Sequence, residues 1–125
     1  MKVFAVIALL AGLGAAIGQD EEAKCCCTTY DMSVCLSKVR DKVDAELNTT
    51  YEKALRLTQR VGDQDVENLR DAEQKWMTYR DAACKAEYGL WGKGSGGPNA
   101  HAMCIIRLTR QRTSDLKSVY TKMNR

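Results

Sequence analysis

Residues 31–55 read DMSVCLSKVRDKVDAELNTTYEKAL, and they contain the clearest helical pattern in the chain. Its apolar side chains recur at steps of three or four, at Met32, Leu36, Val39, Val43, Leu47, Tyr51 and Leu55. That spacing places them on one face of an α-helix, which must be buried against other elements. Residues 28–31 can form a capping box at the start of this helix. Gly62 is a suitable C-cap after Val61, and residues 48–50 are the place where so long a helix could break.

Two further amphipathic segments follow. Asp63 or Asp65 can cap a second helix that ends near Gly89 and has apolar positions at Val66, Leu69, Ala72, Trp76, Tyr79 and Ala83. Asn99 can cap a third helix, whose apolar face carries Ala102, Ile105, Thr109, Leu116, Val119 and Met123. The glycine-rich residues 89–98 connect the two. Because each helix has a single apolar face, we expect an all-α fold, a small antiparallel three-helix bundle.

The composition fits one small domain and excludes several functions. The chain has 125 residues, of which 28% are charged and 45% hydrophobic. Its 19 basic and 16 acidic residues give a net charge of +3 without a basic stripe, which argues against a nucleic-acid binder. His101 is the one histidine, and Ser95 has no other base within reach in the sequence. We therefore assign no catalytic residue, no metal ligand and no cofactor.

The first residues are typical of a secretion signal. Lys2 precedes an apolar run over residues 3–11, and small residues at Ala16 and Gly18 favour cleavage before Gln19. We expect residues 1–18 to be a signal peptide and residues 19–125 to be one domain. A retained membrane anchor is the alternative, but a bilayer span needs ~20 apolar residues. The mature chain then has no transmembrane segment, and its location is periplasmic or secreted.

Six cysteines behind a signal peptide predict disulfides. Cys84 lies near the end of the second helix and Cys104 near the start of the third, so antiparallel helices bring them together. That bridge closes a loop of about 20 residues and contributes roughly 3 kcal/mol in the chain-entropy model. Cys35 is within reach of one of residues 25–27, and we take Cys27 as the candidate.

The run at residues 25–27 leaves alternatives open. The two remaining thiols can form a strained ring, pair between chains or stay reduced. Each of the three can instead take one of Cys35, Cys84 and Cys104. Adjacent thiols also suit Cu(I) or Zn(II), although no CxxC pair or histidine at ligand spacing accompanies them. We favour structural disulfides over a metal site.

Two segments are candidates for recognition. Residues 89–99 contain Trp91, Lys93 and Ser95, and a protruding loop with a tryptophan is typical of a binding surface. The alternative is a flexible tether with Trp91 folded back on the bundle. Trp76, Tyr79, Arg80 and Asp81 also lie on consecutive turns. For these we favour a structural role, with the two aromatic rings in the core and Arg80 paired with a carboxylate.

The order of residues resembles the LprI-type lysozyme inhibitor family over about 90 residues. The matching residues are 31–35, Asp44, Leu47, Asn48, Tyr51, Leu55, 69–76, 79–81, Cys84, Gly96, Gly97, Cys104, Thr109, Arg112 and Leu116. The family has a single cysteine upstream of Cys35 where this chain has three. The resemblance implies a helical, disulfide-bonded protein of the bacterial envelope, with a lysozyme as partner.

Taken together, the residues and the resemblance predict an exported, non-enzymatic binding protein. We expect it to inhibit a lysozyme by steric blocking of the glycan cleft, with Trp91, Lys93 and Ser95 as the contact residues. One alternative is a structural envelope protein without action on lysozyme. Another is a thiol-based redox or metal-binding protein that uses residues 25–27.

Overall fold

The computed structural model describes residues 24–25, 27–120 and 122, and three helices account for most of them. The expected signal peptide at residues 1–18 lies outside the described residues. Helix α2 spans Thr29–Thr58, helix α3 spans Asp63–Gly89 and helix α4 spans Gly97–Tyr120. No described helix is apolar enough over a sufficient length to cross a bilayer.

Helix α2 begins with the expected capping box. The Thr28 hydroxyl accepts a hydrogen bond from the Asp31 N–H at 3.1 Å, and the Asp31 carboxylate accepts one from the Thr28 N–H at 3.2 Å. The helix then runs unbroken through residues 48–50, where the Thr49 and Thr50 hydroxyls donate to the carbonyls of Ala45 and Glu46 one turn back.

The predicted boundaries differ from the observed ones at three places. Helix α2 ends at Thr58, and Gly62 is the N-cap of α3 instead of a C-cap after Val61. Asp63 and Asp65 therefore lie inside the first turn of α3, where their negative charge is favourable to the helix dipole. Helix α4 starts at Gly97, ahead of the expected cap at Asn99.

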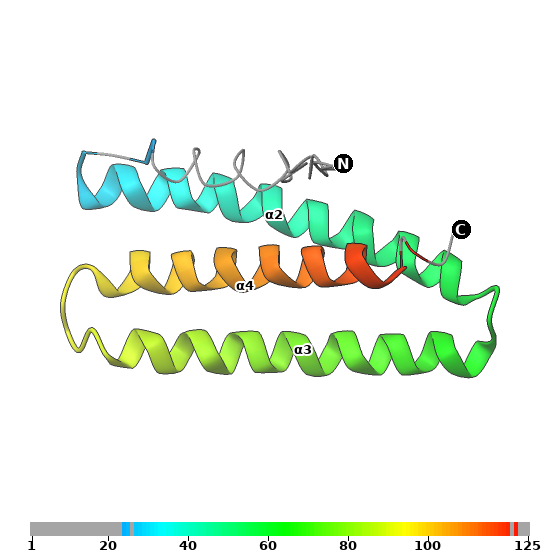
Figure 1. Ribbon diagram of the computed structural model, residues 1–125. Helices are drawn as coiled ribbons and strands as arrows, with labels where there is room; N and C mark the ends of the chain where they lie inside the picture. Colours follow the sequence, from blue (N-terminus) through cyan, green and yellow to red (C-terminus); the bar gives the residue numbers. More distant parts are fainter. Residues whose placement is uncertain (1–23, 26, 121, 123–125) are drawn as a thin grey trace, which may run out of the picture.

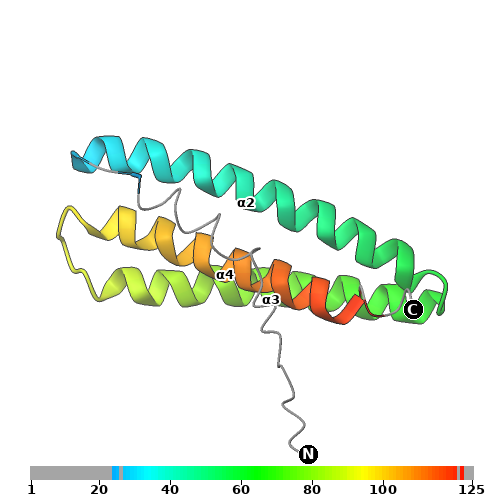
Figure 2. The same cartoon turned by 45° about the horizontal axis from the view of Figure 1, so that its top comes forward.

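The three helices form the expected bundle, with successive helices antiparallel (Figures 1 and 2). Helices α2 and α4 consequently run in the same direction and make the most extensive packing contact. Helices α2 and α3 touch least, so α4 is the element that joins the other two. The all-α fold class is confirmed.

The core is aliphatic and runs along the whole bundle. Leu36, Val39 and Val43 pack with Ile106 at one end, and Leu47, Ala54, Leu69 and Leu116 pack at the other. Leu36, Val39, Val43 and Leu47 belong to the predicted apolar stripe of α2. Ala54 and Ile106 were not predicted, and Met32, Tyr51 and Leu55 of the predicted stripe are only partly buried. Val119, expected on the buried face of α4, lies in the last turn of the helix and is 57% exposed. Met123, expected on the same face, lies outside the described residues.

Candidate functional site

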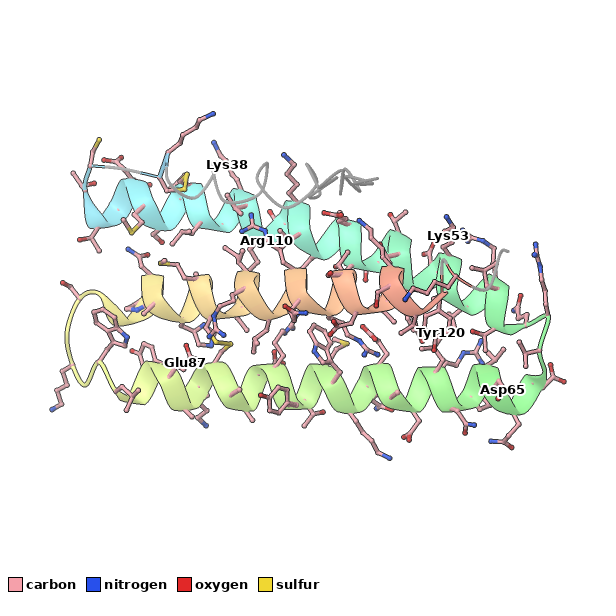
Figure 3. The ribbon with its side chains drawn as sticks, in the orientation of Figure 1. Lys38, Lys53, Asp65, Glu87, Arg110 and Tyr120 are labelled. Carbon is pink, nitrogen blue, oxygen red and sulfur yellow. A yellow bond between two sulfur atoms is a disulfide. The ribbon has the colours of Figure 1, made fainter. Side chains whose placement is uncertain are left out.

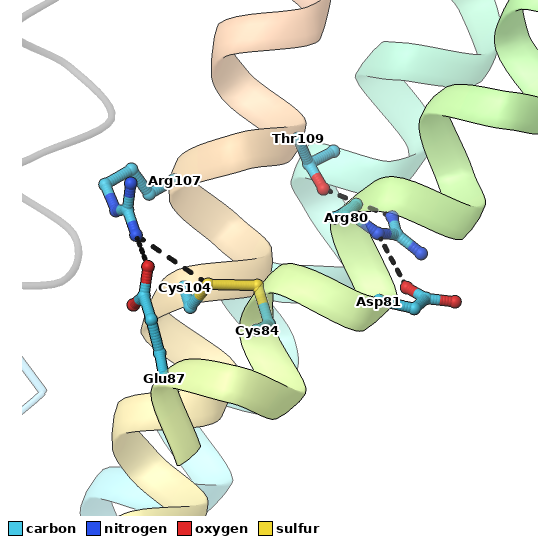
Figure 4. The surroundings of a disulfide bond; sticks show 7 residues. All are labelled: Arg80, Asp81, Cys84, Glu87, Cys104, Arg107 and Thr109. Atoms are coloured by element: carbon cyan, nitrogen blue, oxygen red, sulfur yellow. Dashed lines mark hydrogen bonds and ion pairs between the residues drawn. A yellow bond between two sulfur atoms is a disulfide. The ribbon is translucent and has the colours of Figure 1, made fainter. Parts of the chain in front are cut away.

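A buried disulfide joins the C-terminal part of α3 to the N-terminal part of α4. Cys84 and Cys104 are 0% and 2% exposed, and their Cα atoms are 5.5 Å apart (Figure 4). They pack with Ile105 in the third cluster of the core. The loop between the helices, residues 90–96, therefore starts and ends on a covalently closed base.

A second disulfide ties the N-terminal segment to α2, and it corrects the choice of Cys27. Cys25 is the residue bonded to Cys35, with a Cα–Cα distance of 5.5 Å. Cys25 is 6% exposed and belongs to the core cluster that contains Leu36 and Val39, whereas Cys27 is exposed. Cys27 lies next to the N-cap Thr28, where the chain turns into the helix. That position directs its side chain to the surface instead of toward Cys35.

Both disulfides lie at the end of the bundle that carries the α3–α4 loop. At this end α2 begins, α3 ends and α4 begins (Figure 1). In Figure 3, Glu87 is near this end, while Asp65, Lys53 and Tyr120 are near the other. The opposite end has the short turn at residues 59–62 and the C-terminal end of α4, with no disulfide among the residues described there. The loop is thus carried by the covalently braced end of the molecule.

The α3–α4 loop is a chain of hydrogen-bonded turns. The Trp91 N–H donates to the Tyr88 carbonyl, the Gly94 N–H to the Trp91 carbonyl and the Gly97 N–H to the Gly94 carbonyl, at 3.1 to 3.3 Å. Gly92 has a φ of +56°, which glycine adopts without strain. These bonds define the backbone path of the loop, and the Trp91 ring lies back against Gly96 at the start of α4.

The loop exposes large apolar side chains. Leu90 is 86% exposed, Trp91 54% and Tyr88 41%, and Lys93 and Ser95 are exposed beside them. We call Tyr88, Leu90, Trp91 and Lys93 the loop patch. Trp91 and Lys93 were candidates from the sequence, whereas Tyr88 and Leu90 were missed. Their position in the sequence could have identified them. Both flank Gly89, where α3 ends, and side chains at the end of a helix are less covered by the bundle.

The charged side chains near the loop are an ion pair and an exposed lysine, beside the apolar side chains of the loop patch. Glu87 is paired with Arg107 at 2.6 Å, and Arg107 also donates to the Cys104 sulfur at 3.7 Å (Figure 4). Among the described residues no carboxylate pairs with Lys93, whose ammonium is therefore available to a partner. A surface of this character fits a partner with acidic groups in a concave, partly apolar site.

The motif around Trp76 is mostly internal. Arg80 is 8% exposed, lies 3.0 Å from Asp81 and 3.7 Å from Asp44, and donates to the Thr109 hydroxyl at 3.3 Å. It thereby links all three helices. Trp76 is half-buried, with the Arg80 guanidinium 5.3 Å from its ring centroid. The expectation that Tyr79 packs in the core is wrong, since it is 62% exposed.

A second buried pair lies one turn away. Arg112 on α4 contacts Glu73 on α3 at 2.8 Å, and its guanidinium lies 5.8 Å from the Trp76 ring centroid. Burial raises the pKa of Tyr51 above its ordinary value, and the nearby charge of Glu73 adds to that shift. Within the motif, Trp76 and Arg80 therefore serve packing between helices, whereas Tyr79 and Asp81 are on the surface.

A surface groove lies in the half of the molecule away from the α3–α4 loop. It is a groove of about 530 Å³ between α2 and α4, lined by Ala54, Leu57, Leu116 and Tyr120. The Glu46–Lys117 ion pair borders it. No group of three or more cysteine, histidine or acidic side chains suited to a metal occurs in the described part of the chain.

The profile of the family described as "Lysozyme inhibitor LprI" matches residues 21–116. The chain belongs to this family. It is also 32% identical over 123 residues to a protein of Rhizobium meliloti (strain 1021) described as uncharacterized, and the alignment covers 89% of this chain and 88% of the relative. No solved structure shows a significant match. The resemblance inferred from the sequence is confirmed, and the LprI family implies a protein partner such as a lysozyme.

Proposed function

We propose that this LprI-family protein inhibits a lysozyme by inserting its α3–α4 loop into the glycan-binding cleft. The inhibition is steric and requires no chemistry from the inhibitor. The loop patch supplies the contacts: Leu90 and Trp91 fill apolar space in the cleft, and Lys93 faces carboxylates. The family membership supports the kind of target, and the loop supports the mode of binding.

One observation carries this proposal: two large apolar side chains are exposed on a loop whose base is closed by a buried disulfide. Leu90 and Trp91 are 86% and 54% exposed, and Cys84 and Cys104 are almost fully buried. A loop that is ordered before binding loses less conformational entropy on association, which strengthens affinity. Tryptophan is among the residues that most often dominate interface energies.

Lys93 supplies the electrostatic part of the proposed contact. Glycosidases cleave with a pair of carboxyl groups that flank the scissile bond. The Lys93 ammonium, with no carboxylate partner in the described residues, matches those groups in charge. Ser95 is exposed two residues further on and is placed to donate a hydrogen bond to the same cleft.

The proposal includes export. We propose that residues 1–18 are removed and that residues 19–125 act in the periplasm or outside the cell, where lysozymes attack the cell wall. Two disulfides support this location, because oxidising compartments maintain them and the cytosol does not.

The test is the lysis of bacterial cell walls by several classes of lysozyme, with and without oxidised residues 19–125. We expect micromolar protein to slow lysis by at least one class. Trp91→Ala and Lys93→Ala should each weaken inhibition by about tenfold, in keeping with the loss of an interface hot spot. Tyr79→Ala is the matched control, because Tyr79 is an equally exposed aromatic residue outside the loop.

Two results would contradict the proposal. If no lysozyme is slowed at micromolar protein, the inhibitor function is refuted. If lysis is slowed but Trp91→Ala and Lys93→Ala inhibit as well as the unaltered protein, the loop is not the contact site. Equal losses of inhibition in Tyr79→Ala and Trp91→Ala would likewise show that the loop is not the specific contact site.

A further inference from the structure

Two consecutive glycines, Gly96 at the end of the α3–α4 loop and Gly97 at the start of α4, lie directly against the aromatic rings of the loop patch. A Cβ atom at Gly96 would be 3.0 Å from Cζ3 and 3.2 Å from Cε3 of Trp91. A Cβ atom at Gly97 would be 2.9 Å from Cε2 of Tyr88 and 3.5 Å from Cβ of Trp91. Distances of 3.0 Å or less are shorter than carbon–carbon van der Waals contact, so any side chain at either residue must move a ring.

The backbone itself does not call for glycine at these positions. Gly92 is the glycine with a positive φ in the described loop, and neither Gly96 nor Gly97 has one. The space that the rings occupy is a physical reason for glycine at both positions, and at Gly96, whose carbonyl accepts the Ala100 N–H, glycine is also a favourable N-cap.

The Tyr88 ring is held from a second side as well. It makes an edge-to-face contact with His101 on α4, with ring centroids 6.1 Å apart and planes at 88°. The Tyr88 carbonyl also accepts the Trp91 N–H at 3.1 Å, which couples the two aromatic residues through the turn. Tyr88 and Trp91 thus both pack against the backbone of Gly96 and Gly97, while both remain partly exposed.

We infer that Gly96 and Gly97 are positioning residues that seat the Tyr88 and Trp91 rings as one preformed surface for the partner. This inference rests on the proposed function, because the surface is the one that enters the lysozyme cleft. A methyl group at either glycine displaces exposed rings instead of buried backbone. The bundle therefore stays folded while the surface that meets the partner changes shape.

The experiment compares Gly96→Ala and Gly97→Ala with Gly89→Ala in the oxidised protein labelled with 5-fluorotryptophan. Gly89 is the matched control, because a Cβ atom there meets nothing within 4 Å. The ¹⁹F resonance of Trp91 is assigned with Trp91→Phe. We expect that resonance to move in Gly96→Ala and Gly97→Ala while the Trp76 resonance stays in place. Inhibition should fall about tenfold in both, and stay within twofold in Gly89→Ala.

A double variant separates ring displacement from loss of folding. In a Tyr88→Ala background the ring that meets residue 97 is absent, so Gly97→Ala should no longer lower thermal stability or shift the Trp91 resonance appreciably. An effect of Gly97→Ala that is equally large in this background would overturn the inference for Gly97, because it would come from the backbone.

The remaining outcomes decide the inference independently of the proposed function. An unmoved Trp91 resonance in Gly96→Ala and Gly97→Ala would overturn it, whatever the inhibition assay gives. A moved resonance with unchanged inhibition would overturn the role of the glycines in binding. If the unaltered protein slows no lysozyme, the proposed function fails and takes the binding role with it, while the NMR result still decides whether the glycines seat the rings.

Discussion

The side-chain amide of Asn99, near the start of α4, donates a hydrogen bond to the backbone carbonyl of Thr29, the first residue of α2, at 3.2 Å. Seventy residues separate the two in sequence. The bond ties together the first turns of two parallel helices at the end of the bundle that bears the α3–α4 loop. Asn99 is 7% exposed, so its amide has little water to bond with in place of Thr29.

Replacing Asn99 by alanine should destabilise the protein by about 1 kcal/mol, the usual net value of one such hydrogen bond. The measurement is the midpoint of urea unfolding under non-reducing conditions. Asn48→Ala is the control, since Asn48 is exposed on α2. A loss in Asn48→Ala as large as that in Asn99→Ala would show that the contact between α4 and α2 is not the cause.

Removing the Glu73 carboxylate should destabilise the protein more than Asn99→Ala does, because the charge of Arg112 then has no partner in the interior. Glu73 and Arg112 are 2.8 Å apart, with side chains 9% and 19% exposed. We expect Glu73→Ala to lower the free energy of unfolding by about 2 to 3 kcal/mol. Asp71→Ala breaks an exposed pair with Lys75 and should cost less than about 1 kcal/mol. Equal losses in the two variants would contradict the assignment of Glu73 to the interior network.

The two disulfides should differ in their contribution to stability. Cys84→Ala with Cys104→Ala opens a 20-residue loop and should cost about 3 kcal/mol in the chain-entropy model. Cys25→Ala with Cys35→Ala opens a loop half as long, so its cost should be smaller by about 0.6 kcal/mol. Urea unfolding of both double variants tests the order. The variant without the Cys84–Cys104 bridge should also lose lysozyme inhibition. If it inhibits as strongly as the unaltered protein, the loop needs no closed base.

The raised pKa of Tyr51 predicts a loss of stability in alkali. Burial and the charge of Glu73 favour the neutral phenol in the folded protein. The folded state therefore binds the phenolic proton more tightly than the unfolded state does, and stability falls as the pH rises above about 10. Tyr51→Phe removes this proton, so its unfolding midpoint should depend less on pH above 10. Identical pH profiles for the two proteins would contradict the shift.

The sequence alone was enough for the elements and for the bridge at the base of the loop. Leu36, Val39, Val43 and Leu47 recur at helical spacing, and the period places them on one buried face whatever the neighbouring helices are. The pairing of Cys84 with Cys104 follows from the order of two antiparallel helices joined by a short loop. Trp91 stood out because a large aromatic residue among glycines has no helix of its own to bury it.

Tertiary structure decided what periodicity cannot resolve. Three adjacent cysteines could reach Cys35, and the path of the chain into the cap at Thr28 selected Cys25. Tyr79 and Arg80 are neighbours in sequence, yet the 100° turn between them leaves one on the surface and buries the other among three helices. Gly96 and Gly97 gained their importance from rings folded back on them. The spacing of apolar residues in the sequence determines which face of a helix is apolar. Which residues of two helices touch depends on how the helices pack against each other, and the spacing does not specify that packing.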